Sequence, residues 1–148
     1  MAEILDIADA VVTALNAEAF QGTLEEEFEA VRKYLPRVEL KDMGTLHVTV
    51  VPKAVVTDVA SRSTADYQYQ IDVGVQKRFA AGANEAEEID PLLLIVEQIA
   101  DYLRFKRLDD YTAAMWIKTE HPALYAPEHM EQLRQFTSVL TLTYRRIK

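Results

Sequence analysis

The chain of 148 residues contains no cysteine, which excludes disulfide bonds, a thiol nucleophile and a cysteine-ligated metal. Its 4 glycines and 5 prolines leave little room for linkers between domains. The longest aliphatic run, Leu92 to Val96, is far shorter than the roughly 20 residues that cross a bilayer. The acidic N-terminal segment also differs from a signal peptide. We therefore expect one soluble intracellular domain over residues 1–148, without a membrane partner.

Basic residues are scarce relative to acidic ones. The formal net charge is −8 and the sequence pI is about 4.9. Nucleic-acid binding depends largely on lysine and arginine side chains that neutralise phosphates. We therefore expect no specific nucleic-acid binding, although a local basic patch is compatible with this total.

The stretch from Ala65 to Phe79 is the clearest strand in the chain, because apolar and polar residues alternate along it. Its apolar face, interrupted by Lys77, comprises Tyr67, Tyr69, Ile71, Val73, Val75 and Phe79. At about 3.3 Å per residue this strand would reach roughly 50 Å. A helix of about 15 residues starting at Pro91 would cover only about 22 Å. We expect the strand to extend past the helix. It would then be bent, paired in a protruding hairpin, or in contact with another subunit.

Two further strands are predicted before this one. Alternation marks Phe28 to Leu35 and Leu46 to Val51, and a proline follows each segment. The mixed segment Val55 to Ser63 connects the second of them to Ala65. This order predicts an antiparallel hairpin with its tip near Thr57 to Ser63.

Two strands are predicted near the C-terminus. Alternation marks Thr112 to Thr119 and Gln135 to Ile147. The segment Glu120 to Leu133 contains two prolines and predicts a loop, with a helical turn starting at Pro127.

Two amphipathic helices are predicted. Ile4 to Ala17 carries apolar residues at helical spacing, with acids near its N-terminus. The other begins at Asp90 and Pro91, residues that suit a helix N-terminus, after a break over residues 80–88. Its apolar positions continue to Leu103, and three cations favour its C-terminal end: Arg104, Lys106 and Arg107. The whole order predicts an α+β fold with a mostly antiparallel sheet of about 4–5 strands, two main helices on one face and a long β-hairpin.

Three clusters are candidates for contacts with a partner. Three valines, Val55, Val56 and Val59, are unusual near a hairpin tip, and they belong either to the core or, with Tyr67, to a subunit interface. The acidic cluster Glu25, Glu26, Glu27 and Glu29 forms either a solvated turn or a negative surface that repels a partner or holds it loosely. A second acidic cluster spans Glu85 to Asp90.

Signatures of catalysis are missing from the sequence. The three histidines, His47, His121 and His129, have no metal-ligand spacing, and no glycine-rich phosphate loop or serine elbow occurs. Trp116 and the tyrosines suit packing or an interface better than base stacking on so acidic a chain. We therefore expect no cofactor, no metal and no enzymatic activity.

Six stretches occur in a fixed order over most of the chain: DIADAVVTALN, FEAVRKYLP, LHVTVVPK, SRS followed by YQIDVGVQKR, DPLLLIVEQIADYL and YAPEHMEQLRQFTSVLTLTYR. Together they resemble a family of small phage and prophage proteins from long-tailed phages. The order of elements is also similar to that of tail-terminator and tail-completion proteins, which cap the tail tube as a ring and meet the head connector. The resemblance contains no catalytic signature, so it assigns no functional residue.

The resemblance implies a virion protein that is present in the bacterial host cytoplasm during assembly and in the tail or neck afterwards. Its partners would be copies of itself in a ring, such as a hexamer, and the tail-tube and head-connector proteins. Ring subunits meet head to tail, so the valines would form the subunit interface, while the acidic clusters would line a channel through which DNA slides.

Three alternatives remain open. The first is a head–tail joining protein. The second is a small-molecule-binding or enzymatic α+β domain. A deep pocket that encloses His47 or Trp116 and contains a carboxylate with a shifted pKa would identify it. The third is a regulatory adaptor that binds one protein partner through the valine-bearing hairpin.

Overall fold

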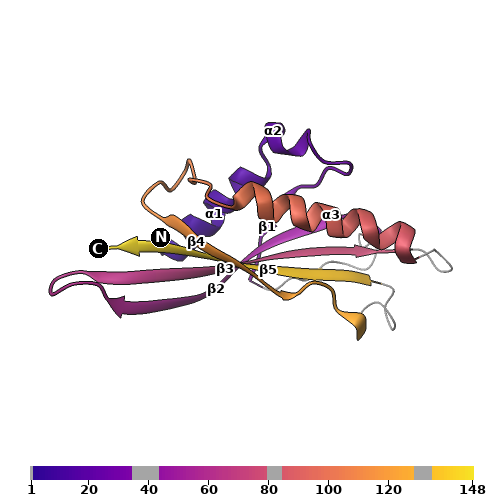
Figure 1. Cartoon of the computed structure of the whole chain (residues 1–148). Helices are drawn as coiled ribbons and strands as arrows, with labels where there is room; N and C mark the ends of the chain where they lie inside the picture. The colour runs from indigo at the N-terminus through magenta and orange to yellow at the C-terminus, as the bar shows by residue number, and fades with distance from the viewer. Residues whose placement is uncertain (1, 35–43, 80–84, 129–134) are drawn as a thin grey trace.

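The computed structural model describes residues 2–34, 44–79, 85–128 and 135–148. In these ranges a five-stranded sheet carries helices on one face (Figure 1). The elements in chain order are α1 (Glu3–Leu15), α2 (Glu18–Gln21), β1 (Ala30–Arg32), β2 (His47–Val59), β3 (Ala65–Arg78), α3 (Glu85–Leu103), β4 (Met115–Ala123) and β5 (Gln135–Ile147). The α+β class, the mostly antiparallel sheet and the two main helices on one face are as predicted from the sequence.

The predicted long strand, β3, is the centre of the sheet. The strand order is β1-β2-β3-β5-β4, and β3 pairs with β2 on one side and with β5 on the other over nearly its whole length. All neighbouring strands are antiparallel except β1, which runs parallel to β2. The alternation in the sequence arises because one face of β3 packs against helices.

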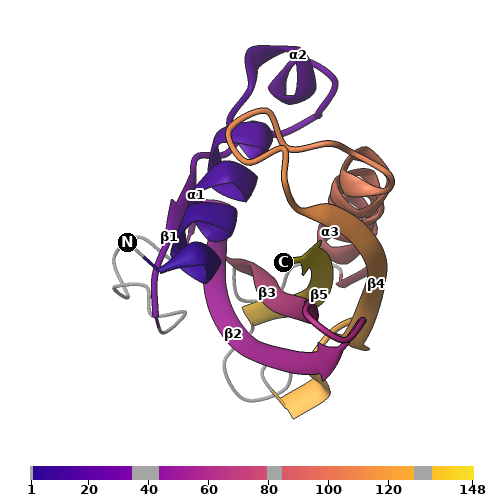
Figure 2. The ribbon, with the colours of Figure 1, turned by 90° about the vertical axis from the view of Figure 1, so that its left-hand side faces the viewer.

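The core lies between the sheet and the two long helices. Figure 2 shows α1 and α3 over the same face of the curved sheet, α1 on the side of β2 and α3 on the side of β4. The helices contribute Ile7, Val11, Leu15, Ile95, Ile99 and Leu103, and the sheet contributes Ile71, Val73, Leu140 and Leu142, all fully or almost fully buried. Burial of each such side chain contributes about 1.5–3 kcal/mol.

The hairpin of β2 and β3 projects beyond the helices (Figure 1). The 14 residues of β3 span about 46 Å, and the 19 residues of α3 span about 28 Å, so the strand outreaches the helix. The predicted end of the preceding strand at Val51 is wrong, because β2 continues through Pro52 to Val59. Pro52 is tolerated because β1 pairs with β2 only as far as Val50, which leaves this part of β2 at an edge.

The predicted start of the second helix is also wrong. Helix α3 begins at Glu85, so Pro91 lies inside it, and residues 85–88 of the predicted break are helical. Pro91 is exposed, and on that side of a helix water can satisfy the carbonyl that proline leaves unpaired. Residues 80–84 lie outside the described ranges. The cations predicted to favour the C-terminus follow Leu103, and no basic residue lies in the last turn.

Three further boundaries differ from prediction. Strand β1 has only three residues, Ala30–Arg32, and the end of the predicted segment, Leu35, lies outside the described ranges. Strand β4 starts at Met115 and continues to Ala123, so the predicted loop begins later than Glu120. Its Pro122 lies where the pairing with β5 is irregular, at the outer edge of the sheet. Residues 127 and 128 are helical, as expected for the predicted turn.

Candidate functional site

The three valines near the hairpin tip are exposed, which excludes the core interpretation. Val55, Val56 and Val59 expose 46%, 42% and 84% of their surface. The strands reach closer to the tip than predicted, because Thr57 to Val59 belong to β2 and residues 60–64 form the turn. The valines therefore stand on the outer strand of a three-stranded ladder, because β5 pairs with β3 as far as Asp66, and this pairing holds them in fixed positions.

A β-bulge at Lys53 determines which way the valines face. Before it, Val50 pairs with Val73, and after it the register shifts so that Val55 pairs with Tyr69 and Val59 with Ala65. Residues directly opposite each other lie on the same face of an antiparallel pair. The extra residue therefore places Val55 and Val59 on the helix-covered face of the sheet, beyond the end of α1, and leaves Val56 on the other face.

Tyr67, the fourth predicted interface residue, is half-buried and already has neighbours within the chain. Its ring lies 6.2 Å from the ring of Tyr69, and the Lys148 ammonium is 4.7 Å from its centroid. The C-terminal lysine thus covers part of the surface that the sequence assigned to a partner.

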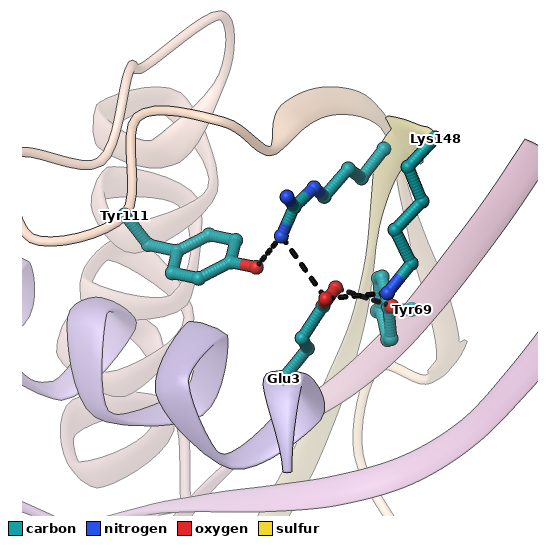
Figure 3. Close-up of polar contacts among 5 residues, drawn as sticks. Glu3, Tyr69, Tyr111 and Lys148 are labelled. Atoms are coloured by element: carbon teal, nitrogen blue, oxygen red, sulfur yellow. Dashed lines mark hydrogen bonds and ion pairs between the residues drawn. The ribbon is translucent and has the colours of Figure 1, made fainter. Parts of the chain in front are cut away.

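Five polar side chains meet where the hairpin leaves the helices, and we call them the terminal cluster: Glu3, Tyr69, Tyr111, Arg146 and Lys148 (Figure 3). The Glu3 carboxylate accepts a 2.7 Å hydrogen bond from the Tyr69 hydroxyl and binds Lys148. Arg146 lies 3.0 Å from Glu3 and also donates to the Tyr111 hydroxyl. The cluster connects the first turn of α1, β3, the segment before β4 and the end of β5.

The terminal cluster fixes the protonation states of its members. Hydrogen bonds from Lys148 and Tyr69 lower the pKa of Glu3 from an ordinary 4.5 to about 2. Burial, reinforced by the hydrogen bond to Glu3, raises the pKa of Tyr69 well above its usual value. Glu3 is therefore a carboxylate and Tyr69 a neutral phenol at neutral pH, which suits a structural ionic junction rather than proton transfer.

The predicted acidic cluster is divided between two environments. Glu26 binds the Lys77 ammonium at 2.9 Å, which attaches the loop between α2 and β1 to β3. Glu25, Glu27 and Glu29 are exposed, and the last two line a depression of about 580 Å³ beside α2. In the second cluster Glu87 and Asp90 are exposed on the first turns of α3. The loop that leads to β4 leaves the opposite, C-terminal end of this helix (Figure 1).

Trp116 lines a groove of about 460 Å³ between the loop after α3 and the start of β4. The groove also contains Phe105, whose ring meets the Trp116 ring edge-on at 4.9 Å, together with Met115, Lys106 and Arg107. None of its described lining residues is a carboxylate, and Glu3, the acid with a perturbed pKa, lies elsewhere. The groove is therefore apolar and basic.

The histidines are separated from one another. His47 is half-buried on β2 with its Nε2 atom 3.1 Å from Thr45 Oγ1, His121 is exposed on β4, and His129 lies outside the described ranges. Among the residues that the structure describes, no group of three histidine, aspartate or glutamate side chains is placed to hold a metal ion. No helix in these ranges has the length and apolar character needed to span a membrane.

Sequence reasoning missed the terminal cluster and the groove. The members of the cluster are up to 145 positions apart, so no local pattern connects them. The groove has one local signal, since a phenylalanine, Phe105, directly follows a helix end where glycine is common. Compared with protein-family models the chain matches none, and no curated protein shows significant similarity to it.

Proposed function

We propose that the protein is a structural component of a phage or prophage virion, which assembles as a ring at the end of the tail tube in the manner of tail terminators. The observation that carries this proposal is the projecting hairpin. Most large aliphatic side chains of the sheet are buried, whereas Val55, Val56 and Val59 are exposed on a regular, hydrogen-bonded ladder beyond the helices. Such a surface is typical of a protein–protein contact.

The two edges of the sheet support a head-to-tail arrangement. In the described ranges, β2 beyond Val50 pairs only with β3, and β4 pairs only with β5. These edges lie on opposite sides of the sheet and differ in sequence. Two unlike edges favour heterologous contacts, which close into rings when the rotation per subunit allows it.

We infer that Glu25, Glu27 and Glu29 face the channel of the ring, where negative charge would repel the DNA backbone. These three side chains are exposed, whereas Glu26 is held by Lys77. The tail-tube and head-connector proteins are the partners that this role requires.

The proposal is tested by light scattering over a concentration series and by negative-stain images of the same sample. We expect closed rings with a central hole for the parent chain. The double variant V55N/V59N is expected to remain monomeric with an unchanged thermal midpoint, because both side chains are exposed. The matched control is V31N, since Val31 is a valine of similar exposure, 44%, on β1.

Different outcomes separate the alternatives. A parent chain that stays monomeric even with tail-tube protein added, and that behaves like V55N/V59N, would contradict a ring. Rings that bind portal-type connector but not tail tube would favour a head–tail joining protein. Rings of E25Q/E27Q/E29Q that exclude duplex DNA as well as parent rings do would contradict the acidic channel.

A further inference from the structure

Two features of Phe105 are unfavourable for a phenylalanine: its backbone conformation and its exposure to solvent. Its backbone φ of 57° lies in the left-handed region, where a side chain is strained and glycine is the usual residue after a helix. The residue is also 81% exposed, although its side chain is one of the larger apolar ones of the protein. Strain of this kind is characteristic of functional sites. The position therefore points to a role outside the folded monomer.

The groove around Phe105 is chemically distinct from the rest of an acidic surface. Phe105, Met115 and Trp116 supply its apolar lining, while Lys106 and Arg107 supply its charge. Arg107 is exposed and forms no ion pair among the residues that the structure describes. An occupant should therefore combine an apolar anchor with a neighbouring carboxylate.

The hairpin tip has both of these features. Val59 is 84% exposed, the highest value among the exposed large apolar residues of the described chain. The residue before it, Asp58, lies directly opposite Asp66, and Asp66 already binds Arg145 at 3.0 Å. Like charges directly opposite each other are destabilising, and within the described ranges Asp58 has no cation of its own.

We propose that the groove lined by Phe105 and Trp116 receives the hairpin tip of a second copy of this chain. The tip enters the groove end-on, so that Val59 on one face of β2 packs against the two rings while Asp58, on the opposite face, pairs with Arg107. The inference deepens the proposed ring assembly and rests on it, because it names the two surfaces that meet. Tip and groove are different surfaces, so the contact is heterologous and repeats from one subunit to the next.

The absence of cysteine makes the contact directly measurable, since any disulfide reports only on introduced residues. V59C and M115C chains are prepared separately, mixed and oxidised, and disulfide-linked dimers are counted on a non-reducing gel. A disulfide forms only when the two Cα atoms approach within about 7 Å. We expect dimers in the mixture at least tenfold above those of either chain alone, and a ladder of multimers from V59C/M115C. The control mixture is V31C with M115C.

The outcomes separate this inference from the proposed function. Rings in light scattering and images without cross-links above the control would overturn the inference and leave the ring in place. Cross-links that stop at dimers would support the docking contact and contradict the ring. Neither assembly nor cross-links would overturn both.

A second variant distinguishes a role of Phe105 in association from a role in the stability of the monomer. F105G removes the ring and the backbone strain together, so we expect an unchanged or higher thermal midpoint and at least tenfold weaker self-association. L94A, which shortens an exposed leucine on α3, is the control and should alter neither quantity. The charge-swapped D58R/R107D chain should associate more strongly than either single variant. A lower thermal midpoint for F105G with unchanged association would overturn the inference.

Discussion

The Tyr69 hydroxyl donates a 2.7 Å hydrogen bond to the Glu3 carboxylate, so the central strand fixes the first turn of α1 across 66 positions of sequence. Lys148 and Arg146 bind the same carboxylate. The first helix and the last strand thus share one ionic junction at the base of the projecting hairpin. We expect both ends of the chain to unfold in one step with the central strand.

The first prediction concerns the pH dependence of this junction. The pKa of Glu3 is about 2 in the folded state and 4.5 ordinarily, so its carboxylate stabilises the fold above pH 4.5, and this stabilisation is lost as the pH falls towards 2. The full difference corresponds to about 3 kcal/mol, which solvent screening at this partly exposed site reduces to about 1 kcal/mol. Urea unfolding of E3Q should therefore show a free energy of unfolding about 1 kcal/mol below the parent at pH 7, with the gap closing on acidification.

E97Q is the matched control for this experiment, because Glu97 is an exposed carboxylate in the middle of α3 without an ion pair among the described side chains. Its unfolding free energy should follow the parent at every pH. A gap between E3Q and the parent that stays constant from pH 7 down to pH 3 would contradict the linkage to Glu3.

The second prediction concerns Tyr144, whose side chain is fully buried in β5. Its hydroxyl has no hydrogen-bond partner in the described part of the chain, and burial raises its pKa well above the usual range. A buried hydroxyl without a partner is destabilising, so Y144F should raise the unfolding free energy by about 1 kcal/mol. Y102F is the control with the opposite expected sign, because the Tyr102 hydroxyl donates a 2.9 Å hydrogen bond to the Ala14 carbonyl. Loss of this bond should lower the unfolding free energy by about 1 kcal/mol. A less stable Y144F would mean that the hydroxyl is satisfied.

The third prediction concerns the attachment of the acidic loop. The Phe20 ring on α2 stacks on the Tyr102 ring of α3 at 4.0 Å and meets the Phe28 ring edge-on at 6.3 Å. F20A removes these contacts from a buried position and should lower the unfolding free energy by about 3–5 kcal/mol. A glutamate-specific protease should also cleave after Glu25 or Glu27 faster than in the parent under native conditions. Unchanged cleavage would show that Phe20 does not hold this loop.

Much of the fold follows from local pattern, and the exceptions have physical causes. The sequence predicts β3 and β5 almost to the residue, because one-sided burial imposes alternation on both strands. It divides β2 at Pro52, since an edge that tolerates proline is visible only after the sheet is assembled. It starts α3 too late for a similar reason, because the exposed side of a helix accommodates Pro91.

The candidate site divides in the same way. The sequence identifies Val55 and Val59 as unusual, but the face on which they lie depends on the register shift after Pro52. The terminal cluster and the groove depend on contacts between distant segments, so their chemistry emerges only from the fold. Local pattern thus locates exposed features, and tertiary structure decides which of them meet.

The last prediction tests the bulge itself by deleting Lys53. Because Pro52 pairs with Ile71 and Ala54 with Gln70, the deletion closes the ladder without moving any other side chain to the opposite face. The 3.9 Å approach of Lys53 to Asp72 contributes less than about 1 kcal/mol, so the unfolding free energy should change little. Deletion of Thr49, the control, displaces buried Val48 or Val50 from the core and should prevent cooperative unfolding. Bulges increase strand twist, so the folded variant lacking Lys53 should carry a straighter hairpin and associate more weakly in light scattering. Association equal to the parent would show that the bulge only adjusts register and does not aim the valines at a partner.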